Sequence, residues 1–215
     1  MSNINREYIE SYIRDITPRH SGYLQDMEDY AYDNDIPIIE PEVSQFMKLI
    51  VKLYKPRKIL EIGTAIGYSA LVMAESLEGN FRITTIERDE KMISLAKKYV
   101  SRSPYNNNIT ILEGDASEIL SGLVDNYDFI FLDGAKGQYL QFLNHCKKLL
   151  SPHGLIVSDN VLFKGMVASD ELLIKRKKTI VKRLREYLKY INEMEGYISS
   201  IIPIGDGIAL TYREE

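Results

Sequence analysis

Acidic residues lie at or beside the ends of five short apolar runs in the central part of the chain. The runs cover 58–62, 82–87, 109–113, 128–133 and 155–159. The acids at these ends are Glu61, Glu87, Asp115, Asp133 and Asp159. If the runs are parallel strands, their carboxyl ends meet at one edge of a sheet, where open α/β sheets bind ligands. One surface acid is ordinary, but five along one edge indicate a functional site.

Two of these ends offer oxygen donors for a cation. Asp133, Asp159 and Asn160 suit a hard cation such as Mg²⁺, with water or substrate completing its coordination. No His or Cys accompanies them, which argues against zinc. The alternative is that Asp159 and Asn160 only cap a turn. Lys136, three residues after Asp133, is a candidate general base if its pKa is lowered there; a solvated lysine is the alternative.

A glycine turn and an acid further along suggest a nucleotide ligand. Gly63 and Gly67 permit close backbone approach and open a helix N-terminus. Glu87 follows Gly63 by 24 residues, where such folds place an acid that binds a ribose diol. Together they predict an adenosine-containing ligand, although a plain tight turn and a solvated Glu87 remain alternatives. The third glycine of the dinucleotide motif is missing, which argues against an NAD-dependent dehydrogenase.

The elements that must position these residues follow from hydrophobic periodicity. Apolar runs alternate with amphipathic helices expected at 67–77, 89–101, 116–124 and 137–150, which indicates a parallel sheet with right-handed crossovers. A long helix is expected over about 171–194. The runs 197–202 and 207–212 flank a Pro-Ile-Gly-Asp turn, so the last strand should be antiparallel. We expect one domain over 1–215, with N-terminal helices in 1–56 and the sheet core in 57–215.

Composition and charge narrow the setting. The chain has 215 residues, one cysteine and a net charge of −4. Neither a signal peptide nor a membrane-length apolar segment is visible, and with a single cysteine this favours a cytoplasmic location and no membrane partner. Residues 164–189 hold nine Lys or Arg and three Asp or Glu. This basic segment fits a large anionic partner, although a solvated helix face is the commoner reading of such a stripe.

Three spaced motifs resemble those of the cation-dependent class I O-methyltransferases, which include catechol and caffeoyl-CoA O-methyltransferases. They are LEIGTAIGYS at 60–69, DGAK at 133–136 and SDNV at 158–161. The resemblance covers about 35 to 212. It implies a Rossmann-like seven-stranded sheet of order 3-2-1-4-5-7-6, with strand 7 antiparallel, helices on both faces, and a homodimer. In that family Ala often stands where Gly134 follows Asp133, a departure that removes only a side chain.

The resemblance also implies a role for each motif residue. Contacts to S-adenosylmethionine would come from Ile39, Glu61, Gly63, Ser69, Glu87, Asp115, Ala116 and Asp133. Of these, Glu87 would hold the ribose, Asp115 and Ala116 the adenine, and Ile39 would close over the cofactor. Mg²⁺, or another divalent cation, would bind Asp133, Asp159 and Asn160. Catalysis would involve Lys136 as the base and Asp133.

Within that family, the segments 134–139, 159–165 and 202–207 and the cluster 175–178 most resemble the bacterial tRNA 5-hydroxyuridine methyltransferases. This implies formation of 5-methoxyuridine at the wobble position, with the tRNA anticodon stem-loop as partner. The RNA-binding candidates are Lys164, Lys175, Arg176, Lys177, Lys178, Lys182 and Arg185. The alternative is a small-molecule O-methyltransferase acting on catechols or caffeoyl-CoA-like thioesters. A non-catalytic nucleotide- or RNA-binding protein is a third hypothesis, which the cation set and Lys136 disfavour.

Overall fold

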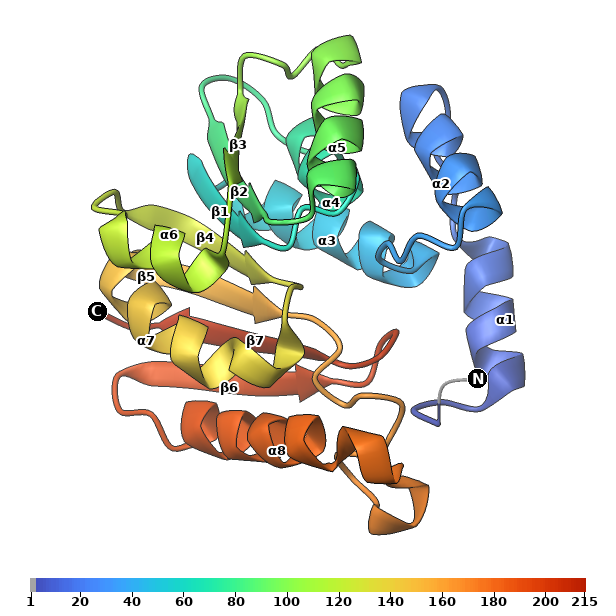
Figure 1. Cartoon of the computed structure of the whole chain (residues 1–215), viewed down its shortest axis with the longest axis vertical. Coiled ribbons are helices and arrows are strands. Elements are labelled where there is room, and N and C mark those ends of the chain that lie inside the picture. The colour runs from blue at the N-terminus through green and yellow to red at the C-terminus, as the bar shows by residue number, and fades with distance from the viewer. Residues whose placement is uncertain (1–2) are drawn as a thin grey trace.

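The computed structural model describes residues 3–215. Within them, seven strands form one sheet in the order β3-β2-β1-β4-β5-β7-β6 (Figure 1). The strands are β1 Lys58–Ile62, β2 Arg82–Glu87, β3 Ile109–Glu113, β4 Tyr127–Leu132, β5 Leu150–Ser158, β6 Tyr197–Ile202 and β7 Ile208–Arg213. β7 pairs antiparallel with both β5 and β6, and the other neighbours pair parallel. The predicted strand order and antiparallel last strand are confirmed.

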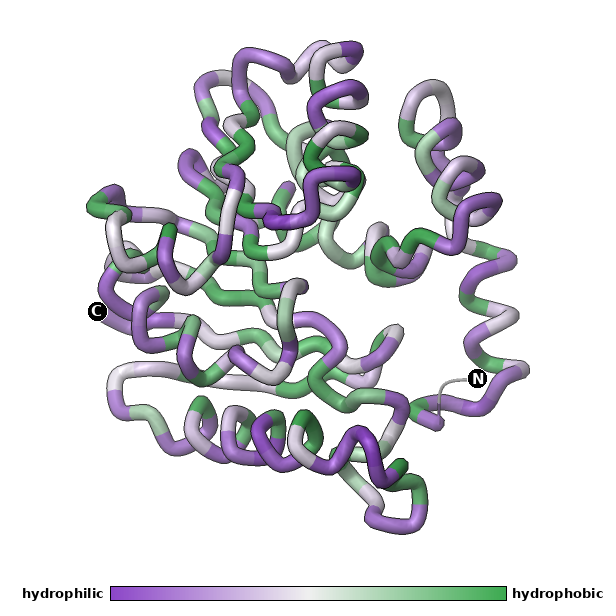
Figure 2. Tube along the Cα trace, in the orientation of Figure 1, coloured by the Kyte–Doolittle hydropathy of each residue, from purple (hydrophilic) through white to green (hydrophobic). Residues whose placement is uncertain are grey.

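Helices cover both faces of the sheet. They are α1 Glu7–Ile16, α2 Tyr23–Asp33, α3 Pro41–Tyr54, α4 Tyr68–Glu75, α5 Glu90–Arg102, α6 Ala116–Gly122, α7 Tyr139–Leu149 and α8 Lys178–Asn192. One buried apolar cluster joins α2, α3, α4 and α5 to one face, and a second joins α6, α7 and α8 to the other. Alternate residues of β1 serve the two clusters, Ile59 the first and Leu60 the second. Figure 2 shows the resulting apolar band along the central strands.

Local sequence sets where these helices begin. Pro41 occupies the start of α3, where its missing N–H costs nothing. Asp89 caps α5 by accepting a hydrogen bond from the amide of Met92, and Asp115 caps α6 through the amide of Ser117. Both caps follow strand ends, so each helix starts at the carboxyl edge of the sheet.

Two expected bounds differ from the structure by more than two residues. β5 starts at Leu150, because Leu150 pairs with Tyr127 before an irregularity in the ladder shifts the register. The helix expected over 171–194 begins only at Lys178; two short 3₁₀ turns, Asp170–Leu172 and Lys175–Lys177, precede it. Arg185 of α8 donates to the carbonyls of Met166 and Val167 and to Asp170, and these bonds fold the preceding loop back over the helix.

Helix α1 lies beyond the carboxyl ends of β4 and β5 (Figure 1). None of its residues is buried. It is attached through a bidentate pair between Arg14 and the buried Glu42, with N–O distances from 2.7 to 3.1 Å. Asn3 and Asn5 donate to the carbonyls of Lys164 and Pro203. These polar anchors hold α1 over the loops that follow β5 and β6.

Candidate active site

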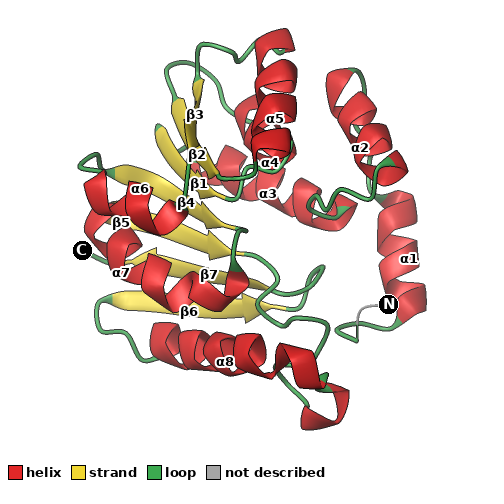
Figure 3. Cartoon of the chain, in the orientation of Figure 1, coloured by secondary structure: helices red, strands yellow, loops and turns green. Residues whose placement is uncertain are grey.

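The chain leaves β1, β4 and β5 through tight turns on one side of the sheet (Figure 3). Gly63 has φ +104°, and a Cβ placed on it would lie 2.7 Å from the amide nitrogen of Gly134. Glycine at 63 therefore lets the turns after β1 and β4 touch. Each turn extends the ladder by one bond: the Asp133 amide donates to Ile62 and the Asp159 amide to Leu132, both at 2.9 Å. The two aspartates consequently stand on neighbouring strand ends.

A cavity of about 360 Å³ opens at these turns. The predicted site residues that line it are Ile39, Gly63, Glu87, Asp133, Lys136, Asp159, Asn160 and Lys164. A second cavity of about 120 Å³ shares Gly63 and Glu87 with the first and is also lined by Asp115 and Ala116. The structure thus gathers the predicted cation ligands, the general-base candidate and the acid after β2 around one continuous depression.

Glu87 sits where the two cavities meet, and main-chain amides fix its carboxylate. One oxygen accepts from the amide of Ala65 at 2.9 Å, and the other accepts from Arg88 at 2.8 Å and Asp89 at 3.0 Å. A carboxylate has about four lone-pair sites, so further donors can still bind. Glu87 is therefore held rigidly yet able to accept bonds from a diol.

The second cavity, which we call the slot, is lined by residues that follow β2, β3 and β4. Asp115 caps α6 and lies 3.6 Å from the Arg88 guanidinium. Gln138 and Phe142, which sequence reasoning missed, supply an amide and an aromatic wall. Their helix is connected to β4 by the turn that carries Lys136, so their position depends on tertiary structure that a local motif does not reveal.

The cation candidates form an oxygen-rich group at the other end of the main cavity. Asp159 is 1% exposed, and one of its carboxylate oxygens accepts from the Asn160 amide at 2.6 Å. Lys136 lies with its Nζ 4.0 Å from the Asp133 carboxylate. Among residues 3–215, no group of three or more His, Cys, Asp or Glu could hold a metal ion. A cation here therefore depends on the Asn160 amide and on ligands from outside the chain, and the hard oxygen donors fit Mg²⁺.

Burial and mutual repulsion set the protonation of this group. Burial raises the pKa of Asp133 to about 6, a net value that includes the opposing effect of Lys136 and a smaller upward effect of Glu40. The pKa of Asp159 is also raised well above its usual value, by burial first and then by Asp133 and Glu40. Two carboxyls that resist ionisation side by side need a positive charge to bring them to the ionised state.

Tyr139, at the start of α7, braces the two ligand-bearing strand ends. Its buried hydroxyl lies 3.0 Å from the Leu132 carbonyl and 2.9 Å from the Asp159 carbonyl. Its ring packs edge-on against Tyr187 with centroids 5.5 Å apart. The hydroxyl therefore fixes the spacing between the end of β4 and the turn after β5.

Glu61 and Ser69 occupy a different place from the other predicted cofactor contacts. Glu61 is fully buried at the end of β1 and accepts bonds from the hydroxyls of Ser69 and Thr85. Burial raises the pKa of Glu61 to about 7. Neither residue lines the two cavities, so in this structure they support the Gly63 turn from within.

Other cavity-lining residues were also missed by sequence reasoning. Glu40 and Asp206 line the main cavity beside the cation candidates, and Phe163 adds an aromatic ring. Burial raises the pKa of both Glu40 and Asp206. Asp206 lies in the turn between β6 and β7, and Glu40 in the extended segment before α3. In the sequence both positions lie in segments between predicted helices and strands, and only the fold brings them together.

The basic segment begins at the main cavity, which Lys164 lines, and its loop before α8 lies on the side toward which β4 and β5 point (Figure 1). Most RNA-binding candidates are exposed, namely Lys164, Lys175, Arg176, Lys178 and Lys182. Lys177 lies over the Phe163 ring at 5.7 Å. Arg185 differs, because the loop carbonyls and Asp170 already occupy its guanidinium. Lys182 lies 3.8 Å from Glu186.

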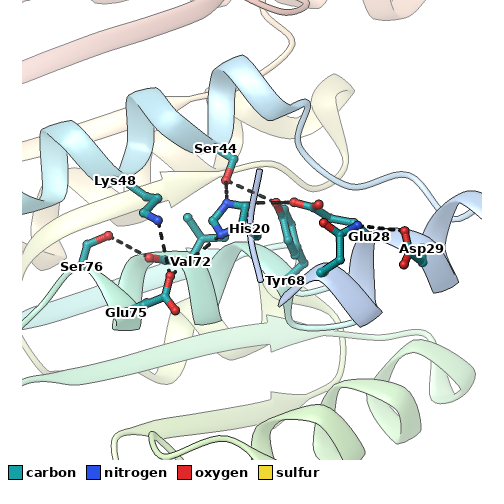
Figure 4. Close-up of polar contacts among 10 residues, drawn as sticks. His20, Glu28, Asp29, Ser44, Lys48, Tyr68, Val72, Glu75 and Ser76 are labelled. Atoms are coloured by element: carbon teal, nitrogen blue, oxygen red, sulfur yellow. Dashed lines mark hydrogen bonds and ion pairs between the residues drawn. The ribbon is translucent and has the colours of Figure 1, made fainter. Parts of the chain in front are cut away.

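A polar cluster connects the N-terminal helices to the start of α4 (Figure 4). Tyr68, the first residue of α4, donates to Glu28 of α2, and its hydroxyl lies 3.3 Å from that of Ser44 in α3. Ser44 also bonds the His20 ring at 3.0 Å. Burial lowers the pKa of His20. The cluster positions the helix that follows the Gly63–Gly67 turn against α2 and α3.

The sheet has the strand order of the class I methyltransferase fold. Its glycine turn, the carboxylate at the end of β2 and the main cavity all lie where the strand order reverses, the usual ligand-binding place in such sheets. The family model for O-methyltransferases matches residues 15–214. The chain therefore belongs to the O-methyltransferase family.

Individual relatives agree with this assignment. A catechol O-methyltransferase from Niastella koreensis is 32% identical over 79% of this chain and 80% of its own. A caffeoyl-CoA O-methyltransferase from Stellaria longipes is 26% identical over 98% and 92%. The crystal structure of a Staphylococcus aureus protein proposed to be a caffeoyl-CoA O-methyltransferase has a TM-score of 0.88 and 31% identity, covering 96% of this chain and all of that one. An O-methyltransferase from Bacillus cereus, solved in complex with SAH, has a TM-score of 0.84 at 24% identity, covering 96% and 97%.

Proposed function

We propose that this protein transfers a methyl group from S-adenosylmethionine to one hydroxyl of an acceptor that presents two adjacent oxygens, with the help of a divalent cation. The observation that carries the proposal is the grouping of Asp133, Asp159 and Asn160 beside Lys136, in a cavity that continues past Glu87. A structurally similar protein supports the cofactor, since the Bacillus cereus enzyme was solved with S-adenosylhomocysteine (SAH).

In this proposal each side chain has a defined task. Glu87 accepts hydrogen bonds from the ribose hydroxyls, while Asp115 and Ala116 border the adenine. Asp133, Asp159 and Asn160 would hold the cation, which would supply a positive charge that lowers the pKa of an acceptor hydroxyl. Lys136 Nζ would accept the hydroxyl proton only in its neutral form, which a cation bound beside it would favour by charge repulsion. Fixing the acceptor oxygen in line with the sulfonium methyl then lowers the barrier by proximity.

A catechol-like small molecule is the acceptor that the named relatives favour. Catechol and caffeoyl groups both carry two neighbouring hydroxyls, the arrangement that a cation with open positions can chelate. The main cavity of about 360 Å³ suits a single ring beside the cofactor.

A second candidate is 5-hydroxyuridine at the tRNA wobble position, and the exposed basic segment supports it. The 5-hydroxyl and O4 of this base can chelate a cation much as a catechol does. Lys164 lines the main cavity. Lys175, Arg176, Lys177 and Lys178 lie at the junction between the loop after β5 and α8, where they could contact the phosphates of an anticodon stem-loop.

The experiment is methyl transfer from labelled S-adenosylmethionine to catechol and to an anticodon stem-loop carrying 5-hydroxyuridine, each with Mg²⁺ and with chelator. Transfer to catechol that stops on chelation supports the main proposal. Transfer to the stem-loop alone, lost when Lys175, Arg176 and Lys178 are changed to Glu, supports the tRNA candidate. Transfer to neither, or transfer that chelator leaves unchanged, overturns the proposed function.

We also propose that the protein is a homodimer, and helix α1 supports this. Its outer residues Tyr8, Tyr12 and Ile16 are 73%, 65% and 61% exposed. An apolar stripe of this kind on a helix is normally covered. Light scattering of the wild type and of Tyr12→Asp tests the proposal: a monomeric wild type would overturn it.

None of the helices described in residues 3–215 has the length and apolar character of a membrane span.

A further inference from the structure

Helix α1 is amphipathic, but its polar face rather than its apolar face is turned toward the rest of the molecule. Its apolar residues face away from the molecule, while Glu7, Glu10, Arg14 and Asp15 line a cavity of about 510 Å³. We call this cavity the vestibule. A surface helix usually turns its apolar stripe inward. Here the polar stripe faces inward, so its charges border the space through which a substrate can approach.

The vestibule is continuous with the candidate active site. Glu40, Lys164 and Asp206 line both the vestibule and the main cavity. The slot shares Gly63 and Glu87 with the main cavity, at the end opposite to the vestibule. The order is therefore slot, cation group, vestibule. With the cofactor in the slot, the part of an acceptor that extends beyond its methylated ring points into the vestibule.

The charge of this space is predominantly negative. Five carboxylates line it: Glu7, Glu10, Asp15, Glu40 and Asp206. Of the two cations there, Arg14 is already neutralised by the bidentate contact with Glu42, which lies outside the lining. Lys164 remains as the counter-charge.

One of these carboxylates also lacks a bonding partner. The Oε1 atom of Glu10 is buried and finds no hydrogen-bond donor among residues 3–215. A buried acceptor without a donor is costly, so a rotation of the Glu10 side chain that brings this oxygen to an N–H of a ligand in the vestibule would remove that cost. The vestibule therefore combines an excess of negative charge with an unmet acceptor.

We infer that the vestibule selects acceptors whose side arm carries an ammonium or other N–H donor, and that it disfavours arms ending in a carboxylate or phosphate. This inference rests on the proposed function and narrows its substrate class. It separates this chain from an enzyme built for a coenzyme A thioester, whose arm is anionic. An RNA acceptor would have to keep its phosphates outside the vestibule, on the basic segment.

The test compares two catechols with arms of similar length and opposite charge, 3,4-dihydroxyphenethylamine and 3,4-dihydroxyphenylacetate. Binding is measured by calorimetry with Mg²⁺ and S-adenosylhomocysteine present, and kcat/KM is measured with S-adenosylmethionine. One net ion pair in a partly buried site corresponds to about a tenfold difference, so we expect at least that preference for the amine. The preference should shrink as ionic strength rises.

Variants locate the source of the preference. The double change Glu7→Gln and Glu10→Gln should reduce it at least about threefold. Glu78→Gln is the matched control, because Glu78 is an exposed acid in a cavity that shares no lining residue with the vestibule. It should leave the preference unchanged. Binding of S-adenosylhomocysteine by each variant verifies that the fold is intact.

The outcomes distinguish this inference from the proposed function. Equal binding of the two arms, preference for the acid, binding of neither, or a preference that survives the double change would each overturn the inference. Unsubstituted catechol, which has no arm, is assayed in parallel. If catechol is methylated in a cation-dependent reaction, the proposed function stands even when the inference fails. If neither catechol nor either of the two substituted catechols is methylated, the result counts against a small-molecule acceptor.

Discussion

Replacing Tyr139 by phenylalanine removes one hydroxyl from between the two strand ends that carry the cation candidates. In the wild type this hydroxyl lies 3.0 Å from the Leu132 carbonyl and 2.9 Å from the Asp159 carbonyl. The ring and its edge contact with Tyr187 remain, so the substitution leaves no sizeable cavity. What changes is the support of the Asp159 turn.

The expected magnitude follows from burial. The Leu132 carbonyl keeps the Asp159 amide as a donor, so the loss falls on the Asp159 carbonyl. Leaving that carbonyl without its donor costs about 1–3 kcal/mol of folding free energy. Residues that orient metal ligands typically change metal affinity by about 10- to 100-fold when mutated. We therefore expect Tyr139→Phe to weaken Mg²⁺ or Mn²⁺ binding by at least about tenfold.

Calorimetric titration with Mn²⁺, alongside denaturant unfolding, measures both effects. Tyr187→Phe is the matched control, because it removes a buried tyrosine hydroxyl from the same aromatic pair. That hydroxyl bonds the Ser158 side chain at 2.5 Å rather than the backbone of a ligand residue. If both variants lose similar stability and both keep wild-type cation affinity, Tyr139 is a purely structural residue and the bracing argument is refuted.

Four further outcomes are expected. Burial raises the pKa of Glu61 from 4.5 to about 7. The protonated carboxyl therefore contributes stability that is fully present below pH 4.5 and is lost as the pH rises through 7. The free energy of unfolding of the Glu61→Gln variant should not show this decline with pH. Glu87→Ala should weaken S-adenosylmethionine binding by about 1.5–3 kcal/mol, and unchanged calorimetric affinity would remove Glu87 from the site. Cation affinity should fall as the pH drops through about 6, where Asp133 becomes protonated, and chelation should stop turnover until Mg²⁺ is restored. Gly63→Ala should destabilise more than Gly67→Ala in thermal unfolding, since the new Cβ meets backbone at 2.7 Å in the first case and Ala96 at 3.5 Å in the second.

The sheet was predictable because its signals are local. Buried parallel strands appear as short apolar runs, and four of the five central runs match strands to within one residue. The exception, β5, starts early because Leu150 pairs with Tyr127 across the sheet. A cross-strand pairing of this kind leaves no trace in the run itself.

The expected helix over 171–194 was wrong in its first turns for a tertiary reason. Its composition suits a helix, yet Arg185 binds the carbonyls of Met166 and Val167, and Leu172 packs against Gly165. These contacts hold the loop before α8 in 3₁₀ turns. Likewise, α1 is one of the N-terminal helices expected in 1–56, while its orientation, with charged residues lining a cavity, was not predicted.

The site was only partly visible in the sequence, because strand ends are predictable and connections are not. Asp133, Asp159 and Asn160 follow strands, so their proximity could be anticipated. Glu40 and Asp206 come from an extended segment and a hairpin turn, with no periodicity to place them. The roles of all five stay predictions until a cation and an acceptor are tested.

Backbone strain falls on the turns that carry the site, which explains their geometry. Ala65, Ala135 and Asn160 follow β1, β4 and β5 and have φ values of +44°, +51° and +54°. Each such residue costs on the order of 1 kcal/mol or more and persists only where surrounding contacts over-determine it. Here the Ala65 amide is held by Glu87, the Ala135 carbonyl by the Gln138 amide, and the Asn160 amide by Asp159. The bonds that hold Ala65 and Asn160 at positive φ also orient the carboxylates of Glu87 and Asp159. A change that lets either turn relax should therefore also release the carboxylate bound to it.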